Sequence, residues 1–319
     1  SRFKILRRAG NVYLFFMGIV ILALAGEIAC RLLLARKVAG AEAFRVRHPH
    51  AYDARTLMEA WTDSLWAQPW EEYKKSARAV MSVGDQEYVV ETNSLGYRTR
   101  EFSPRKASGV VRVICIGGST TVQGQTNATT YPALLEAMLR ERHPSWSVEV
   151  LNLGISGVQS EYWPRKRYSF LDFEPDVVVQ YEGVNDLLHT HMRRWARDHP
   201  YVAALYRSVL FASLAPYPHH QFDEHIRGTV ENMVGVTTAS AKAGAAHVVG
   251  TFAAPDISRA SAEVRRYLEV NLMEQWGSRR SPLYSYTSYY ALLQYFNEAL
   301  ASHASSGYRI APVAERLKE

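Results

Sequence analysis

The sequence is poor in cysteine and has no concentrated block of basic residues. Only two cysteines occur in 319 residues, which excludes the small proteins whose folds depend on several disulfides. The net charge of +6 is spread along the chain without a long run of Lys and Arg, so we expect no nucleic-acid partner. With 47% hydrophobic residues, the composition also excludes intrinsic disorder and predicts a large buried core.

The first forty residues contain a long hydrophobic run that is able to cross a membrane. From Val12 to Leu34 the sequence reads VYLFFMGIVILALAGEIACRLLL, and a bilayer core requires about 20 apolar residues of helix. The segment before this run contains four cations and no acid, namely Arg2, Lys4, Arg7 and Arg8. The positive-inside rule then keeps the N-terminus in the cytoplasm. We therefore predict a single-pass protein of the bacterial inner membrane whose main domain is periplasmic.

Two features of this run admit other interpretations. Ala23-Leu24-Ala25 resembles the cleavage site of a secretory signal peptide, but we favour an uncleaved anchor. Glu27 is an ionisable residue in an apolar segment, which normally indicates a paired charge or a functional contact. The simpler interpretation is an ion pair with Arg31, one helical turn further on, and the alternative is a contact with a neighbouring membrane subunit. The expected partners are membrane lipid and integral-membrane proteins that bind through the anchor.

The sequence divides into four segments. They are a cytoplasmic basic segment at 1–10, a transmembrane anchor at 11–35, an extracytoplasmic neck and lead-in at 36–108, and a main domain at 109–319. Within the neck, weak helical spacing with interspersed aromatic residues predicts a helix over 42–80. The alternating sequence QEYVVET predicts a short strand at 86–92.

Apolar runs and helical patterns alternate after residue 109. Five runs have the pattern of buried strands in a parallel sheet, at 110–117, 147–154, 176–183, 246–255 and 308–314. Helical spacing lies between them, at 131–143, 160–173, 194–212, 223–243, 259–276 and 284–304. This alternation predicts an α/β fold, a doubly wound sandwich in which ligands bind beyond the carboxyl ends of the strands.

The first three predicted strands each run into a loop of small residues that holds a chemically useful group. Ser119 lies in GGSTT, Gly157 in NLGISG and Asn185 in EGVND. Parallel strands bring their carboxyl ends to one edge of a sheet, so we expect the three loops to meet there. A hydroxyl, an unobstructed backbone N–H and an amide donor are the parts of a serine nucleophile with an oxyanion hole. Each residue alone also has an ordinary structural use, as a helix cap, a turn or a helix start.

The order of these three motifs, each after a strand, resembles the SGNH (GDSL-type) serine hydrolase superfamily over residues 110–319. The first motif reads GGS where the family usually has GDS, and it follows an N-S-L-G-Y-R segment at Asn93–Arg98 of a kind found in membrane-anchored members. The resemblance implies a flavodoxin-like three-layer sandwich with a five-stranded parallel sheet. It also implies that Ser119 is the catalytic nucleophile, with its own N–H, the Gly157 N–H and the Asn185 side chain as oxyanion donors.

The family's fourth element, a D-x-x-H block whose histidine is the catalytic base, is not found in the expected context. The sequence DLLH at 186–189 has the right letters but directly abuts the Asn185 motif, so His189 is a weak candidate for the base. Without a base, a serine is a poor nucleophile at neutral pH. We therefore favour a catalytically silent structural or binding subunit of a larger membrane protein complex. The alternative is a serine esterase that uses Ser119 to hydrolyse acyl esters of envelope polysaccharide or lipid.

The remaining chemistry-bearing residues give little indication of a metal or a cofactor. The sequence HHQFDEH places His219, His220 and His225 close together as a weak candidate metal site, but the spacing matches no zinc motif and is more typical of a polar loop. No haem-attachment motif and no phosphate-binding glycine loop occurs in the sequence, so we predict no cofactor. Cys30 and Cys115 lie in apolar segments and are predicted to be free thiols.

Overall fold

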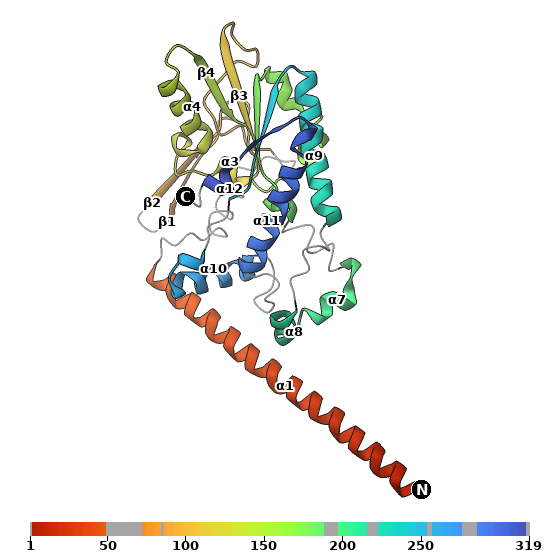
Figure 1. Cartoon of the computed structure of the whole chain (residues 1–319). Helices are drawn as coiled ribbons and strands as arrows, with labels where there is room; N and C mark the ends of the chain where they lie inside the picture. Colours follow the sequence, from red (N-terminus) through yellow and green to blue (C-terminus); the bar gives the residue numbers. More distant parts are fainter. Residues whose placement is uncertain are drawn as a thin grey trace. The chain divides into compact units, whose positions relative to one another are not determined.

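The computed structural model describes residues 2–48, 72–83, 86–187, 197–215, 223–253, 257–275 and 286–316. The chain forms two units (Figure 1). The helical unit comprises Ser1–Arg47, Ala196–Tyr217 and Ile257–Ser288, and the sheet unit comprises His48–Trp195, Pro218–Asp256 and Tyr289–Glu319. Most of the neck predicted at 42–80 lies outside the described residues.

The helical unit is built on one long helix. α1 (Arg2–Arg47) has 46 residues, and its part from Gly10 to Arg47 is long and apolar enough to cross a membrane. The most apolar stretch of this helix has a mean hydropathy of 2.3, and none of its residues is buried within the described part of the chain. The helix predicted over the hydrophobic run is thus confirmed, with a length that exceeds the roughly 20 residues a bilayer core requires.

α10 (Ala262–Gln275) packs against the C-terminal part of α1. Ala41 and Val270 are buried together, and the rings of Phe44 and Tyr267 lie 5.0 Å apart. Arg47 forms an ion pair with Glu263. The helix predicted at 259–276 is confirmed, and a short 3-10 turn, η5 (Ile257–Arg259), precedes it.

Two short helices take the place of the helical stretch predicted at 194–212. α7 (Pro200–Leu205) and α8 (Val209–Leu214) are separated by a break at Ser208. Ser208 has an extended backbone with ψ of 122°, and its hydroxyl accepts a hydrogen bond from the N–H of Phe211 at 3.1 Å. A serine that caps a new helix in this way interrupts the preceding one, although the apolar spacing continues across it.

The sheet unit contains a five-stranded sheet in the order β4-β3-β5-β6-β7. Its strands are β3 (Val110–Gly117), β4 (Ser147–Asn152), β5 (Val177–Tyr181), β6 (Ala246–Gly250) and β7 (Arg309–Ala311). Neighbouring strands pair in parallel throughout, which confirms the predicted α/β fold and its five strands. Because β3 lies between β4 and β5, the carboxyl ends of the first three strands of the sheet are neighbours.

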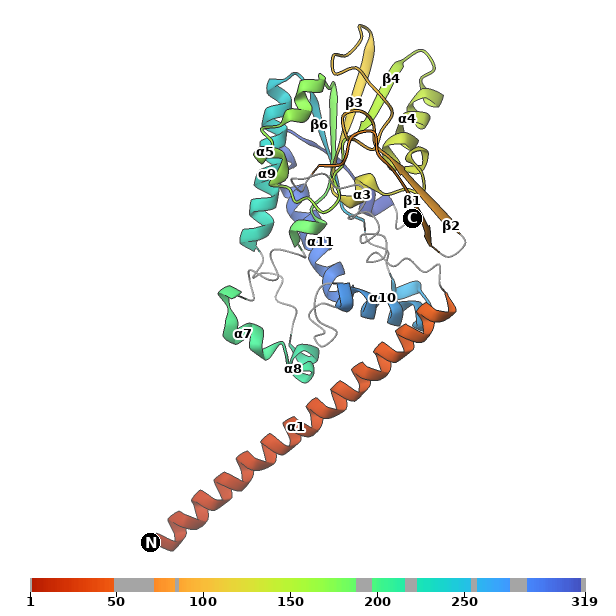
Figure 2. The same cartoon turned by 180° about the vertical axis from the view of Figure 1, so that it is seen from behind.

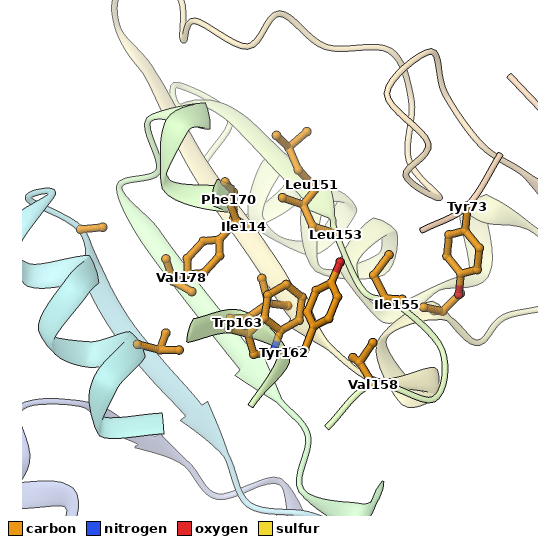
Figure 3. Close-up of a cluster of buried hydrophobic side chains, with 14 of the residues drawn as sticks. Tyr73, Ile114, Leu151, Leu153, Ile155, Val158, Tyr162, Trp163, Phe170 and Val178 are labelled. Carbon is orange, nitrogen blue, oxygen red and sulfur yellow. The ribbon is translucent and has the colours of Figure 1, made fainter. Parts of the chain in front are cut away.

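Helices cover both faces of this sheet, with α4 (Tyr131–Arg142) on one side and α9 (Asp223–Lys242) and α11 (Tyr286–Ser302) on the other (Figure 2). Alternate side chains of β3 and β4 enter two cores. Ile114 and Leu151 join the larger core (Figure 3). The smaller core lies against α4 and consists of Val113, Cys115, Val148 and Val150. Both faces are therefore apolar, and the three-layer arrangement is confirmed.

A pair of antiparallel strands lies outside the parallel sheet. β1 (Arg78–Val83) pairs with β2 (Gln86–Glu91) along their full lengths. The strand predicted at 86–92 is confirmed. The helix predicted over 42–80 is wrong at its end, because residues 78–80 belong to β1. β1 supplies hydrogen-bond partners along one edge of β2, and on the other edge the N–H of Val89 donates to the carbonyl oxygen of Gln125 at 2.8 Å.

The helix predicted at 160–173 is interrupted. α5 (Tyr162–Arg165) is followed by two residues in the left-handed conformation, Arg167 with φ of 51° and Tyr168 with φ of 54°. A 3-10 helix, η2 (Ser169–Phe173), continues the chain. The break allows Trp163 and Phe170 to enter the same core, where their rings meet edge to face at 5.7 Å. The remaining short elements are α3 (Ser119–Val122), η1 (Asn127–Thr129), η7 (Ala304–Ser306) and α12 (Val313–Arg316).

Candidate active site

Ser119 lies at the carboxyl end of β3, where the chain turns into the short helix α3. It is the first residue of that helix and is half-buried. The turn requires glycine at position 117, because φ there is 151° and a Cβ would lie 2.3 Å from the carbonyl oxygen of Tyr181. The N–H of Gln123 donates to the Ser119 carbonyl at 2.8 Å and closes the helical turn. The serine is thus held at the edge of the sheet where ligands bind in folds of this class.

The loops after β4 and β5 meet the Ser119 loop at this edge. The Asn185 side chain donates a hydrogen bond from Nδ2 to the carbonyl oxygen of Val158 at 2.8 Å. A Cβ at Gly118 would lie 2.9 Å from the same Nδ2, so the amide lies against the backbone next to Ser119. Gly157 precedes Val158 and has a left-handed φ of 76°. The structure therefore brings together the three loops that hold the predicted nucleophile and its oxyanion donors.

Asp186 ties the loop after β4 to the loop after β5. Its carboxylate accepts hydrogen bonds from the N–H of Ser160 at 3.0 Å and from the Ser160 hydroxyl at 2.6 Å. The Ser160 Oγ in turn accepts a hydrogen bond from Nδ2 of Asn232 on α9 at 2.9 Å. Burial raises the pKa of Asp186 to about 6, although the bonds from Ser160 oppose the shift. This network links both loops to a helix on the face of the sheet.

Glu182 is a second buried carboxyl group beside the same loop, and it is not one of the predicted site residues. Its two oxygens lie 3.0 and 2.9 Å from the donor Nε1 of Trp163, and Gln180 also donates to it. Burial, with a smaller contribution from the charge of Asp186, raises the pKa of Glu182 to about 8. The sequence did contain an indication of this site, because Glu182 lies at the end of a predicted buried strand and precedes a glycine. Buried acids thus lie on both sides of Asn185 in the sequence.

Arg98 holds the segment that follows Ser119. It is only 1% exposed, and its guanidinium donates to the carbonyl oxygen of Val122, at the end of α3, and to that of Gly124 at 2.9 Å. It also donates to the carbonyl oxygen of Val89 at 3.1 Å and to Oδ1 of Asn127 at 3.0 Å. Burial lowers the pKa of Arg98 to about 10. The N-S-L-G-Y-R segment therefore has a physical role, which is to position the loop after the candidate nucleophile.

A cavity of about 230 Å³ lies beside this arginine, lined by residues that include Arg98, Arg100, Asn127, Glu136 and Asn152. Arg100 forms an ion pair with Glu136 at 2.5 Å across part of its wall. Glu136 also accepts a hydrogen bond from the N–H of Val150 at 2.7 Å. Because the Arg100 cation is already paired, the cavity does not by itself favour an anionic ligand.

The candidate histidines do not join this site in the described part of the chain. His189, His219 and His220 lie outside the described residues, and His225 lies in the first turn of α9. Within the described ranges, no hydrogen bond joins the Ser119 hydroxyl to a histidine, and no group of three His, Cys, Asp or Glu residues could hold a metal ion. His247 is buried near the start of β6, where burial lowers its pKa to about 4, so it is neutral at pH 7. That position is at the opposite end of the strand from the Ser119 edge.

A comparison of the sequence with models of known protein families identifies one family. Residues 115–317 match the model of the GDSL-like lipase/acylhydrolase family. No curated protein sequence matches the chain.

Similar solved structures include LAE5, described as an alpha/beta hydrolase enzyme from the metagenome of Lake Arreo in Spain. It is 18% identical, with a TM-score of 0.39 over 66% of this chain and 81% of that one. Axe2, an acetylxylan esterase from Geobacillus stearothermophilus, is 14% identical, with a TM-score of 0.38 over 65% of this chain and 80% of that one. A lipase/acylhydrolase from Enterococcus faecalis is 14% identical, with a TM-score of 0.36 over 65% and 78%.

Proposed function

Because this chain belongs to the GDSL-like lipase/acylhydrolase family, we propose that it is a membrane-anchored member that serves as a structural or binding subunit of a larger membrane protein complex. α1 is the anchor, and the sheet unit is on the periplasmic side of a bacterial inner membrane. The basic residues that precede the apolar run support this orientation, since such residues stay in the cytoplasm. The exposed apolar surface of α1 supplies the contacts with lipid and with other membrane proteins.

The proposal that the domain is catalytically silent rests on the hydrogen bonds that Asn185 and Asp186 form within the protein. The Asn185 amide donates to Val158, and the Asp186 carboxylate accepts both hydrogen bonds from Ser160. A buried polar group that loses its partner lowers the free energy of unfolding by about 1–3 kcal/mol. These bonds therefore account for the presence of the motif in a domain that turns over no substrate. The three loops then form a rigid framework at the edge of the sheet.

One observation favours a second function, the hydrolysis of acyl esters of envelope polysaccharide or lipid. The Asn185 Nδ2 lies against Gly118 and so next to Ser119, where an amide donor and a serine hydroxyl would face the same carbonyl group. In such a reaction the Ser119 Oγ attacks the acyl carbon, and the amide stabilises the charge that develops on the carbonyl oxygen. The ester C–O bond then breaks, the alcohol leaves with a proton, and water hydrolyses the acyl-serine. This function also requires a base that accepts the serine proton.

Labelling with a fluorophosphonate, which reacts covalently with an activated serine, distinguishes these functions. The full chain in mild detergent is compared with Ser119→Ala and with an active esterase of the family as the positive control. We expect the control alone to be labelled. A label on this chain that Ser119→Ala abolishes would instead establish the esterase.

The size of the extracted particle tests the second part of the proposal. We expect the chain, extracted from its own membrane in mild detergent, to migrate in a particle that contains other membrane proteins in fixed stoichiometry. A particle that contains only this chain would contradict the subunit assignment.

A further inference from the structure

One carboxylate fastens α8 to the apolar part of α1. The Ser208 hydroxyl donates to Glu27 Oε2 at 2.7 Å, and the N–H groups of Val209 and Leu210 donate to the same carboxylate at 3.1 and 2.9 Å. Arg31 also pairs with Glu27 at 2.7 Å. The ion pair expected from the sequence is confirmed. The contact with a segment about 180 residues away was not predicted, and it places the start of α8 against α1 at the level of Glu27.

The N–H groups at the start of α8 find partners within the protein. The Ser208 Oγ that donates to Glu27 also accepts the N–H of Phe211 at 3.1 Å, so three N–H groups at the start of the helix are satisfied. The Ser213 hydroxyl donates to the Val209 carbonyl at 2.7 Å. The first N–H groups of a helix normally need a cap or water. Here the chain provides the partners itself, as a helix in contact with lipid requires.

The position of Glu27 along α1 indicates the depth of this contact. If the bilayer core begins at Val12, about 20 residues of helix extend it to Arg31. Glu27 is then four residues, or about 6 Å, inside the outer boundary. Helices that lie in the membrane surface bury their apolar face by about 5–10 Å. α8 therefore contacts α1 at the depth in the bilayer that such helices occupy.

α7 and α8 expose large apolar side chains. Three of them are strongly exposed, namely Tyr201 at 88%, Leu205 at 53% and Leu214 at 77%. Between Pro200 and Leu214 the sequence has a single charged residue, Arg207, whose side chain is exposed and long enough to reach the lipid headgroups. An aromatic ring, two leucines and one cation are typical of a segment that lies at a membrane surface.

We propose that α7 and α8 lie in the outer layer of the bilayer beside α1, with Leu205 and Leu214 in contact with lipid acyl chains. The inference rests on the proposed membrane span of α1 and adds a second membrane contact to it. Glu27 is the positioning residue of this contact, because it satisfies the start of α8 at a depth where water is scarce.

Depth-dependent fluorescence quenching tests this inference in vesicles of phosphatidylcholine and phosphatidylglycerol. An environment-sensitive fluorophore is attached to single cysteines placed on a Cys30→Ala background, in which the remaining Cys115 is fully buried. The probe sites are Leu214→Cys on α8, Leu22→Cys in the apolar stretch of α1, and Met138→Cys on α4 of the sheet unit, whose native side chains are all exposed. The quencher is a nitroxide attached near the top or near the end of the lipid acyl chain.

We expect the Leu214 probe to lose more fluorescence with the shallow nitroxide than with the deep one. The Leu22 probe should show the reverse preference, and the Met138 probe should show neither. A Leu214 probe that behaves like the Met138 probe, while the Leu22 probe is quenched, would overturn the inference and leave the anchor intact. A Leu214 probe that is shielded from water but not quenched would also overturn it, because protein and not lipid would then cover α8. If the Leu22 probe is not quenched, the proposed anchor fails and the inference fails with it.

Discussion

Each unit of this protein stabilises one charged group in apolar surroundings with backbone groups. The backbone partners are N–H groups in the helical unit and C=O groups in the sheet unit. In the helical unit, the negative charge of Glu27 accepts hydrogen bonds from N–H groups at the start of α8. In the sheet unit, the positive charge of Arg98 donates to backbone carbonyl groups around the candidate active site. A charge removed from water must find such partners, since its desolvation is otherwise very costly. In both units the charge therefore joins segments that are distant in the sequence.

The two units also differ in the surroundings of a carboxyl group. Glu27 is on a helix and is met by several donors together with the cation of Arg31. Glu182 lies in the core of the sheet unit beside another acid, and burial raises its pKa to about 8. The first carboxylate holds two elements together, whereas the second is favoured in its protonated form at neutral pH.

Removal of the Arg98 side chain should have the largest effect on stability. Arg98→Ala leaves the carbonyl groups of Val122, Gly124 and Val89 without this donor, and we expect a loss of about 4 kcal/mol in the free energy of unfolding. Urea unfolding of the sheet unit within the full chain measures it. Arg78→Ala is the control, because Arg78 forms an exposed ion pair with Glu91 and should cost less than about 1 kcal/mol. Equal losses in the two variants would contradict the importance of the buried contacts.

Glu182→Gln should change how stability depends on pH. The folded pKa of Glu182 is about 8 and its ordinary value is 4.5, so the folded state binds more protons between these values and stability falls as pH rises through this window. The variant lacks this loss, and we expect it to be more stable than the wild type by about 2 kcal/mol near pH 6, by more near pH 8, and similar to it near pH 4. Melting temperatures across this range measure the difference.

Glu87→Gln is the matched control for this experiment, since Glu87 is exposed on β2. It should leave the pH dependence unchanged. A wild-type stability that does not fall between pH 5 and pH 8 relative to Glu182→Gln would show that burial does not favour the protonated form of Glu182.

Glu27→Ala should release α8 from α1 without unfolding the sheet unit. The N–H groups of Val209 and Leu210 lose their acceptor, and we expect their hydrogen exchange to become about tenfold faster, which corresponds to about 1.4 kcal/mol. Hydrogen–deuterium exchange of the full chain in vesicles measures it. Glu42→Ala, an exposed position on the same helix, should leave this exchange unchanged. Exchange that is equally slow in both variants would show that Glu27 does not hold α8.

Ser119→Ala should have the smallest effect, within about 0.5 kcal/mol of the wild type, because the half-buried hydroxyl forms no side-chain hydrogen bond in the described part of the chain. Asn185→Ala should cost about 1–2 kcal/mol, because it removes the bond to Val158. Thermal or urea unfolding of both variants measures the difference. If Asn185→Ala is as stable as Ser119→Ala, the structural role assigned to Asn185 is wrong.

Much of the fold and part of the site were predictable from local patterns. Apolar runs rich in β-branched residues predict buried strands, and the carboxyl ends of parallel strands lie at one edge of a sheet. The sequence therefore predicted that the loops of Ser119, Gly157 and Asn185 lie together. The break at Ser208 was hidden because apolar spacing continues across it. The break after α5 was hidden because two residues other than glycine adopt a left-handed backbone there. In both places tertiary packing overrides the local pattern.

The sequence by itself determined the apolar helix, the parallel sheet and the edge at which the candidate nucleophile lies, because these depend on periodicity and on short-range chirality. Only the tertiary structure decided which backbone groups stabilise Glu27 and Arg98. Every residue carries a backbone C=O group and nearly every residue an N–H group, so the sequence does not indicate which of them become the partners. The partner of Glu27 lies up to 183 residues further along the chain, and folding alone brings the two together.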